Sequence, residues 1–241
     1  MKKLTSAALL ALKLTWKLVL LQLILAVGLQ IFYSFRELMP GGVPLQAAFS
    51  FESLLRAAAQ LVGKFWMVFL LSALIGVTAS GKGSKTVYTM NRLGLHENHI
   101  TLVFGLVFTG YFLLYWALQL AVAYGLFLWY SRFTLVGSNT FMLACWRSEW
   151  LHILLPLNEW WGYLRNLAIC GSFGFTAAFG AQLQRRGKFH VGHLVPPLLC
   201  LVLLNGRVGS FGNDLVLTVL LTAFTIGYYF SMKGGREDED L

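Results

Sequence analysis

The stretch from Ile100 to Tyr130 limits what this chain can fold into more than any other, because it contains no charged residue. As an α-helix it would be about 46 Å long. A hydrocarbon core about 30 Å thick is crossed by roughly 20 helical residues, so the stretch is too long for one straight crossing. Two crossings, however, would have only about 15 residues each. In both cases the stretch predicts helix within a membrane.

Similar apolar blocks recur along the chain, and the composition agrees with them. Hydrophobic residues make up 57% of the chain and charged residues 12%, with a mean hydropathy of +0.67, whereas about a quarter of the residues in soluble proteins are charged. We therefore expect an all-α, polytopic membrane protein with a transmembrane domain at 18–232 and an acidic cytoplasmic tail at 233–241. The six predicted spans are residues 18–35, 61–79, 100–130, 161–183, 190–204 and 214–232.

The basic residues predict the orientation, because cytoplasmic flanks of spans collect Lys and Arg. With six spans and both ends inside, 12 cations lie on the cytoplasmic side and 5 outside, leaving out Lys64 and Arg165 as membrane-embedded. If residues 100–130 formed a hairpin, the split would become 10 to 7. One long third helix is therefore favoured, in a multi-pass protein of the plasma membrane with both termini in the cytosol.

Residues 1–17 are expected to form an amphipathic helix in the membrane interface. Four lysines fall on one side of the helix and four apolar residues lie opposite: Lys2, Lys3, Lys13 and Lys17 against Leu4, Ala7, Ala8 and Ala11. A signal peptide is the competing interpretation. However, Lys13 and Lys17 interrupt the apolar region, and no convincing A-x-A cleavage site follows.

Two further places depart from regular spans. Residues 131–160 combine apolar residues with charges that are expensive at mid-membrane, so we expect an outer-face helix or a re-entrant segment there. Pro196-Pro197 removes two backbone donors from the fifth span and predicts a kink or a break.

Small residues line one face of the fourth span and allow close approach of a helix from this chain or another subunit. They are Ala168, Gly171, Gly174, Ala178 and Ala181.

The acidic residues and the glycine-rich loop suggest no catalytic site. Eight of the ten acidic residues lie in connectors or the tail, and the other two, Glu97 and Asp214, lie at helix boundaries. Asn213-Asp214 is readily explained as the N-cap of the last span. The loop Gly81–Lys85 lacks the spacing of a P-loop. We therefore expect no catalytic residue, no cofactor and no enzyme activity in this chain by itself.

The histidines and cysteines do not predict a metal site. His96 and His99, like His190 and His193, are spaced to share a helical face, but neither pair has an obvious acidic third ligand. We interpret these histidines as solvated polar residues, and Cys145, Cys170 and Cys200 as packing residues. Because the cations sit at the ends of apolar blocks and form no continuous stripe, no nucleic-acid partner is expected.

The predicted cytoplasmic connector, residues 80–99, carries the most informative pattern, within its segment 84–99. Val87, Met90 and Leu93 recur every three residues and would share one helical face, and Gly94 would end the first turn. This pattern predicts a short amphipathic helix.

At this point the sequence resembles the ABC-2 type transporter permeases, whose first cytoplasmic loop carries a T-x-x-R-L-P-[apolar]-[ST]-[RK] stretch before a long third span. The matching residues are Thr89, Arg92, Leu93 and Leu95. Gly94 stands where the family usually has proline, and Glu97 and Asn98 stand where basic residues are common. The wider resemblance, an N-terminal interfacial helix and six spans with both ends inside, covers most of the chain.

The resemblance implies that the connector is a coupling helix that docks on a separate ABC ATPase subunit. Its implied contact residues are Lys85, Tyr88, Thr89, Arg92, Leu93 and Leu95. The chain would then form the substrate pathway of an exporter, as a homodimer or paired with a second permease subunit, surrounded by membrane lipid. Peptides, antibiotics and lipids are all compatible cargoes. The alternative is a multi-span protein of another class, either a transporter not driven by ATP or a membrane assembly or scaffold protein.

Overall fold

The computed structural model describes residues 2–38, 51, 61–80, 88–90, 92, 94–132, 140–157, 159–188, 191–203 and 211–234. The Lys64 side chain, His190 and residues 235–241 of the predicted tail lie outside this description. All regular secondary structure in the described residues is helical, as predicted. The helices are α1 (Lys2–Leu38), α3 (Leu61–Ala79), α5 (Glu97–Tyr130), α6 (Thr140–Arg147), α7 (Glu149–Leu154), α8 (Trp160–Arg185), η2 (Gly192–Leu194), α9 (Val195–Leu203) and α10 (Phe211–Gly234).

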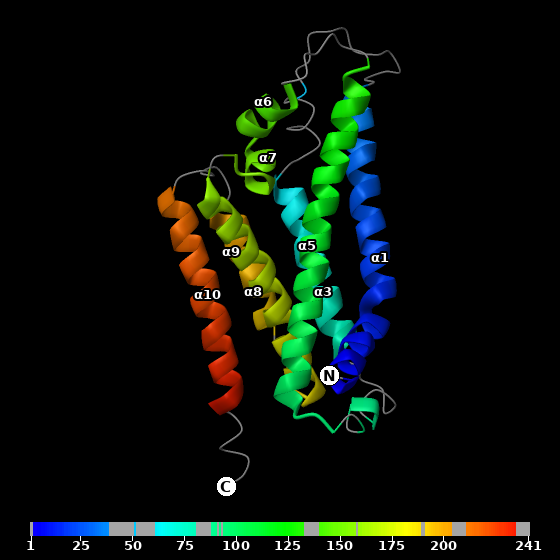
Figure 1. The fold of residues 1–241 in the computed structure, drawn as a ribbon, viewed down its shortest axis with the longest axis vertical. Coiled ribbons are helices and arrows are strands. Elements are labelled where there is room, and N and C mark those ends of the chain that lie inside the picture. Colours follow the sequence, from blue (N-terminus) through cyan, green and yellow to red (C-terminus); the bar gives the residue numbers. More distant parts are fainter. Residues whose placement is uncertain are drawn as a thin grey trace.

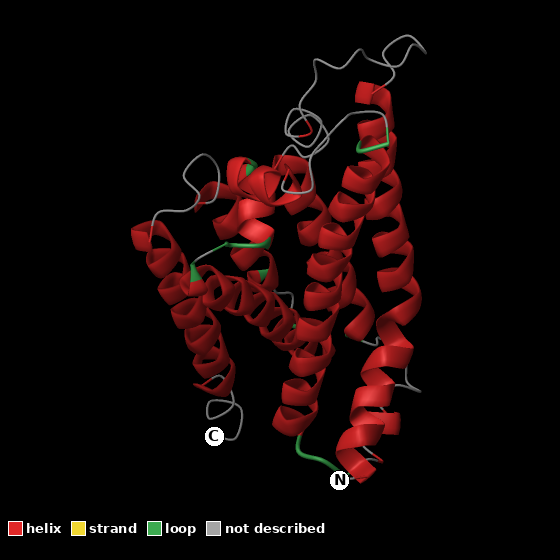
Figure 2. Ribbon diagram, turned by 45° about the horizontal axis from the view of Figure 1, so that its top comes forward, coloured by secondary structure: helices red, strands yellow, loops and turns green. Residues whose placement is uncertain are grey.

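The long helices form an elongated bundle with α8 at its centre. α8 packs against α5, α3 and α10, while α1 packs against α5 and α3, so α1 and α10 lie on opposite sides (Figure 1). We call the end at which α1 and α5 begin and α8 and α10 end the lower end, and the end with α6 and α7 the upper end (Figures 1 and 2). The main core lies between these helices and includes Leu71, Phe104, Phe108, Phe173 and Ala177.

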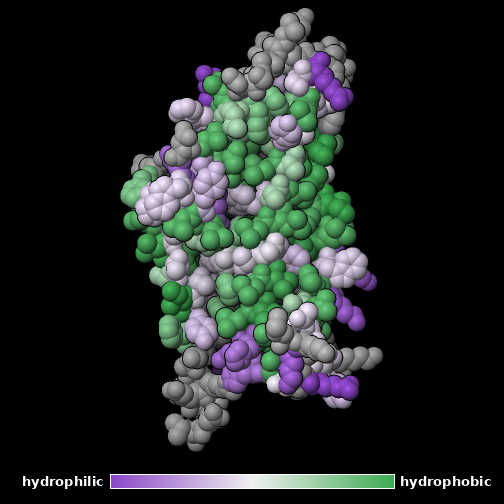
Figure 3. Space-filling view, in the orientation of Figure 1, coloured by the Kyte–Doolittle hydropathy of each residue, from purple (hydrophilic) through white to green (hydrophobic). Residues whose placement is uncertain are grey.

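Within the described residues, three helices are long and apolar enough to cross a membrane: Lys3–Ser34 within α1, Glu97–Tyr130 in α5 and Phe211–Ser231 within α10. Met67–Ala79 and Gly192–Val202 are apolar but shorter. Large apolar side chains cover the sides of the bundle, and Figure 3 shows this hydrophobic surface with hydrophilic residues gathered toward its ends. The structure therefore supports a helical membrane protein. α8, at the position of the predicted fourth span, is long enough, but it carries several polar residues, among them Arg165, Asn166 and Gln182.

α1 differs from the predicted boundary at residue 17. The structure has one continuous helix of 37 residues and no separate N-terminal helix. Ala7, Ala11 and Val19 are all buried on its inner side, whereas Lys13 and Lys17 are exposed. Because the same side of the helix stays buried on both sides of residue 17, there is no local reason for the helix to break there.

α5 is one uninterrupted helix of 34 residues, and the packing of its upper part accounts for its length. The indole Nε1 of Trp116 donates a hydrogen bond to the carbonyl of Leu154, at the end of α7, over 3.3 Å. Above that contact, α5 continues for about 21 Å and packs with α6 and α7 in a second core. Its members include Ala123, Leu126, Phe127, Tyr130, Ala144, Cys145, Trp150 and Leu151. The described part of the ambiguous stretch 131–160 thus contains two short helices, which lie at the upper end.

The described part of the predicted fifth span contains the 3₁₀ turn η2 followed by the helix α9, and it begins inside the bundle. Pro196 and Pro197 lie in the first turn of α9, where their missing N–H groups cost no intrahelical hydrogen bond. They therefore begin a helix after the 3₁₀ turn η2, and do not kink a longer one. His193, in η2, is buried between Gly76 and Gly180, so the expectation of a solvated histidine is wrong. A Cβ at either glycine would lie 3.0 Å or less from the imidazole, which explains why this histidine fits inside.

Candidate functional site

The described part of the connector lies at the lower end, between α3 and α5. Tyr88, Thr89 and Arg92 are helical and exposed, and Tyr88 is 67% exposed. Met90, by contrast, is buried in the main core. Lys85 and Leu93 lie outside the described residues. The connector thus presents polar and aromatic side chains outward while one apolar side chain is fixed in the bundle.

The second half of the connector is fixed by its own backbone and by the start of α5. Gly94 has a φ of +57°, a left-handed conformation that glycine adopts without steric cost. Leu95 packs against the main core. The His96 side chain caps α5, because its Nδ1 accepts a hydrogen bond from the Asn98 amide over 3.3 Å. The rings of His96 and His99 lie 6.1 Å apart.

Two arginines at the end of α8 connect this segment to the bundle. Arg186 donates to the carboxylate of Glu97, with 2.7 Å between Nη2 and Oε2. Arg185 donates from Nη1 to the carbonyl of Ala79, the last residue of α3, over 3.3 Å. Its guanidinium also lies 5.5 Å from the ring centre of Phe104. The lower ends of α3, α5 and α8 are therefore joined, and we call the Glu97–Arg186 pair the lower polar layer.

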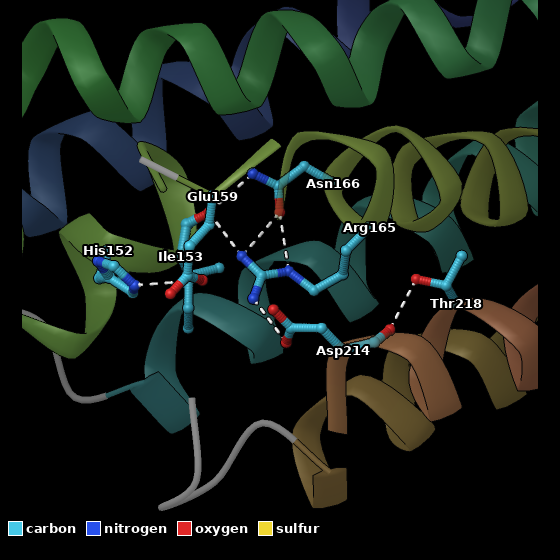
Figure 4. A network of polar contacts seen from close by, with 7 residues as sticks. All are labelled: His152, Ile153, Glu159, Arg165, Asn166, Asp214 and Thr218. Carbon is cyan, nitrogen blue, oxygen red and sulfur yellow. Dashed lines mark hydrogen bonds and ion pairs between the residues drawn. The ribbon is translucent and has the colours of Figure 1, made fainter. Parts of the chain in front are cut away.

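A buried polar network lies near the upper end, between α7, α8 and α10 (Figure 4). Its centre is Arg165 of α8, which is only 1% exposed. Arg165 Nη1 donates to Asp214 Oδ1 of α10 over 2.8 Å, and Nη2 donates to the carbonyl of Ile153 in α7 over 3.1 Å. Three helices thus meet at one guanidinium group.

Asn166 completes this network. Its side-chain oxygen accepts hydrogen bonds from Nε and Nη2 of Arg165, each over 3.2 Å. Its Nδ2 donates to the Ile153 carbonyl over 2.7 Å. A buried charge is tolerated when it is paired and its other polar atoms are hydrogen-bonded, and both conditions hold for Arg165. At its edge, His152 Nε2 and Glu159 Oε2 lie 3.9 Å apart.

The network lies at a distinct depth in the bundle. Ile153, whose carbonyl belongs to the network, directly precedes Leu154, whose carbonyl accepts the hydrogen bond from Trp116. The network therefore lies level with Trp116 of α5, and we call this level the upper polar layer. Along α5, Trp116 lies about 28 Å above Glu97. The two polar layers are therefore separated by about the thickness of a hydrocarbon core.

Sequence reasoning predicted part of this network and missed part. Arg165 was placed within the predicted fourth span, and in the structure it lies in α8 and is buried inside the protein. Asp214 was expected to cap the last span, but α10 begins three residues earlier at Phe211, and the carboxylate pairs with Arg165 instead. Asn166 and the Ile153 carbonyl were missed. The adjacent polar pair Arg165-Asn166 in an otherwise apolar block was the available signal.

The small residues of α8 have unequal surroundings. A Cβ at Gly174 would lie 2.4 Å from the Thr109 amide nitrogen, so the backbones of α8 and α5 approach closely there. Ala178 and Ala181 are fully buried in the main core. A Cβ at Gly171, by contrast, would meet no atom within 4 Å.

The side chains that commonly bind metal ions are scattered in the part of the chain that the structure describes. Among them, no group of three His, Cys, Asp or Glu side chains is placed to hold a metal ion. The three cysteines are free and buried: Cys145, Cys170 and Cys200. The two polar arrangements are therefore a partly exposed connector joined to three helices and a buried brace between α7, α8 and α10.

Comparisons with protein-family models, with curated proteins and with solved structures find no match for this chain.

Proposed function

We propose that this chain is the membrane-embedded permease subunit of an ATP-driven exporter, and that it couples to a separate ATPase through its 84–99 connector. In this proposal the chain crosses the plasma membrane six times, with both ends and the connector in the cytosol. It performs no hydrolysis itself and forms half of the substrate pathway. A second copy or a second permease completes that pathway.

The observation that carries this proposal is the way the connector is mounted. Tyr88, Thr89 and Arg92 are exposed, as a docking surface requires, while Met90 is anchored in the core. The same segment leads directly into α5 and is linked to α8 through Glu97 and Arg186. A force applied to the exposed residues would therefore tilt packed helices as rigid bodies, which is a common basis of alternating access.

The arrangement of the helices also favours six crossings. α1 and α5 run upward and α3, α8 and α10 run downward, and α1 begins at the same end at which α10 finishes (Figure 1). An even number of crossings is needed for both ends to share one side. η2 and α9 return toward the upper end between α8 and α10, and supply the remaining upward passage.

Co-purification from native membranes tests the proposal. The tagged chain should retain an ATPase activity, measured as phosphate release, and the double variant Tyr88→Ala/Arg92→Ala should lose most of it. Arg132→Ala is the matched control, because Arg132 is also an exposed cation but follows the upper end of α5. Equal ATPase recovery with the double variant would contradict the proposed contact. Purification of a stable chain with no associated ATPase would instead favour a transporter not driven by ATP or a scaffold protein.

A further inference from the structure

We propose that Arg185 and Gln182, near the lower end of α8, form a binding site for a phosphate group. Arg185 donates from Nη1 to the Ala79 carbonyl over 3.3 Å, and its guanidinium lies 5.5 Å from the Phe104 ring centre. Its Nη2 is covered by protein and has no hydrogen-bond partner among the described residues. A covered N–H group without an acceptor is costly, and this one indicates an acceptor that the chain itself does not supply.

The other buried arginine of α8 shows how this chain satisfies a guanidinium that has a structural role. Arg165 pairs with the Asp214 carboxylate over 2.8 Å. Its remaining N–H groups donate to the Asn166 side-chain oxygen and to the Ile153 carbonyl. Nothing comparable surrounds Arg185, so the packing of α8 alone does not explain its charge.

The charges at the lower end do not balance either. Glu97 is close enough to attract the Arg185 charge. However, its carboxylate is bonded to Arg186, with 2.7 Å between the charged atoms. In the described part of the chain, no carboxylate lies within ion-pair distance of Arg185. One carboxylate therefore serves two guanidinium groups, and one positive charge is left over.

Gln182 is a second, independent observation at the same place. It lies three residues before Arg185, so the two side chains are neighbours on the surface of α8. Gln182 is fully buried, and neither atom of its amide has a hydrogen-bond partner within the described residues. Its Nε2 can donate to a phosphate oxygen, and its Oε1 can accept from a hydroxyl group or a water molecule bound beside it.

Phosphate is the anion that best fits this pair and its position. A guanidinium presents its N–H groups as a planar fork that matches two phosphate oxygens. Further cations lie nearby: Arg186 and Lys188 follow directly on α8, and the Lys3 ammonium would lie 3.5 Å from a Cβ at Gly94. Figure 3 shows hydrophilic residues gathered at this end of the apolar surface. Phospholipid headgroups present phosphate where the apolar surface of a membrane protein ends.

The site is closed in this structure, because Arg185 Nη2 and the Gln182 amide are both covered. The Arg185 side chain as a whole is only partly buried. Rotation of its guanidinium away from the Ala79 carbonyl would therefore bring Nη2 toward the surface. This movement breaks a single 3.3 Å hydrogen bond between α8 and α3. The inference does not depend on an ATPase partner.

Native mass spectrometry of the purified full-length protein in detergent tests the site. The probe is phosphatidylglycerol, and the reference is a diacylglycerol with the same acyl chains and no phosphate. We expect the first phosphatidylglycerol molecule to bind about tenfold more tightly than the diacylglycerol, and Arg185→Gln to lose this preference. Equal binding of the two lipids, or a preference that survives in Arg185→Gln, would overturn the proposal.

Two further variants make the test independent of folding and of overall charge. Gln182→Met removes an amide that has no partner and should fold normally, yet it should weaken phosphatidylglycerol binding about threefold or more. Arg132→Gln, which removes an exposed cation beyond the upper end of α5, should bind the lipid as the unchanged protein does. Unchanged binding in Gln182→Met, or equal weakening in Arg132→Gln and Arg185→Gln, would contradict a built site.

Inorganic phosphate distinguishes the two sources of the phosphate group. If added phosphate displaces the lipid from the unchanged protein, the site binds the free anion as well, and the proposal stands with a soluble ligand. If the lipid stays bound, the proposal stands with a headgroup as the ligand.

Discussion

Replacing Asp214 with leucine would leave the Arg165 guanidinium buried without its counter-charge. The two side chains are 4% and 1% exposed, respectively, and their atoms lie 2.8 Å apart. Removing one partner of a buried ion pair costs about 3–5 kcal/mol, because the remaining charge stays desolvated. We therefore expect Asp214→Leu to lower the free energy of unfolding by about 3–5 kcal/mol.

The double variant Arg165→Met/Asp214→Leu separates this penalty from the value of the pair itself. With both charges gone, the remaining loss comes from Asn166 and the Ile153 carbonyl, each of which loses donors from Arg165. This loss should be about 1–3 kcal/mol. The double variant should thus be more stable than Asp214→Leu alone.

The Glu97–Arg186 pair provides a matched control within the same protein. Its side chains are 36% and 23% exposed, with 2.7 Å between the charged atoms. Exposed pairs contribute about 0–1 kcal/mol, because water solvates either charge when its partner is lost. Glu97→Gln should therefore have a small effect on stability.

Reversible unfolding of the purified protein in mixed micelles, followed by far-ultraviolet circular dichroism as denaturing detergent is added, measures all three variants. If Asp214→Leu is no less stable than Glu97→Gln, the Arg165 network is not the buried brace described above. A double variant less stable than Asp214→Leu would refute the charge-burial argument in particular.

Two further variants test the packing in the same assay. Gly174→Ala should destabilise the protein by about 1–3 kcal/mol, because the new methyl group meets the Thr109 backbone. Gly171→Ala, where nothing lies within 4 Å, should not destabilise it, and equal losses would contradict the close α5–α8 approach. Gln182→Met should raise the free energy of unfolding by about 1–2 kcal/mol, because no hydrogen-bond partner within the described residues meets either amide atom of this fully buried glutamine. A lower free energy of unfolding for this variant would show that the Gln182 amide forms hydrogen bonds in the purified protein.

The features that the sequence predicted correctly depend on local properties of the chain. The uncharged block at 100–130 predicted helix because its length and charge are visible without knowing its neighbours, and the split of cations between the two sides favoured one long helix over a hairpin. The structure has the single helix α5 there. The position of Arg165 within an apolar block was likewise visible in the sequence, whereas its burial inside the protein is a result of the structure.

The features that sequence reasoning missed depend on contacts between distant segments. Asp214 fits a local capping rule, and only the position of Arg165, 49 residues away, shows why its carboxylate is turned elsewhere. The burial of His193 depends on the space left by Gly76 and Gly180 on two other helices. The excess length of α5 likewise needed α6 and α7 to explain it.

Sidedness of labelling tests the central claim most directly. Single cysteines replace Tyr88, Arg186 or Arg132, in a background with Cys145, Cys170 and Cys200 changed to alanine, and an impermeant maleimide is applied to intact cells and to inverted vesicles. We expect positions 88 and 186 to react only in inverted vesicles and position 132 only in intact cells. Reaction of positions 88 and 132 from the same side would contradict both the proposed membrane arrangement and the cytosolic docking surface.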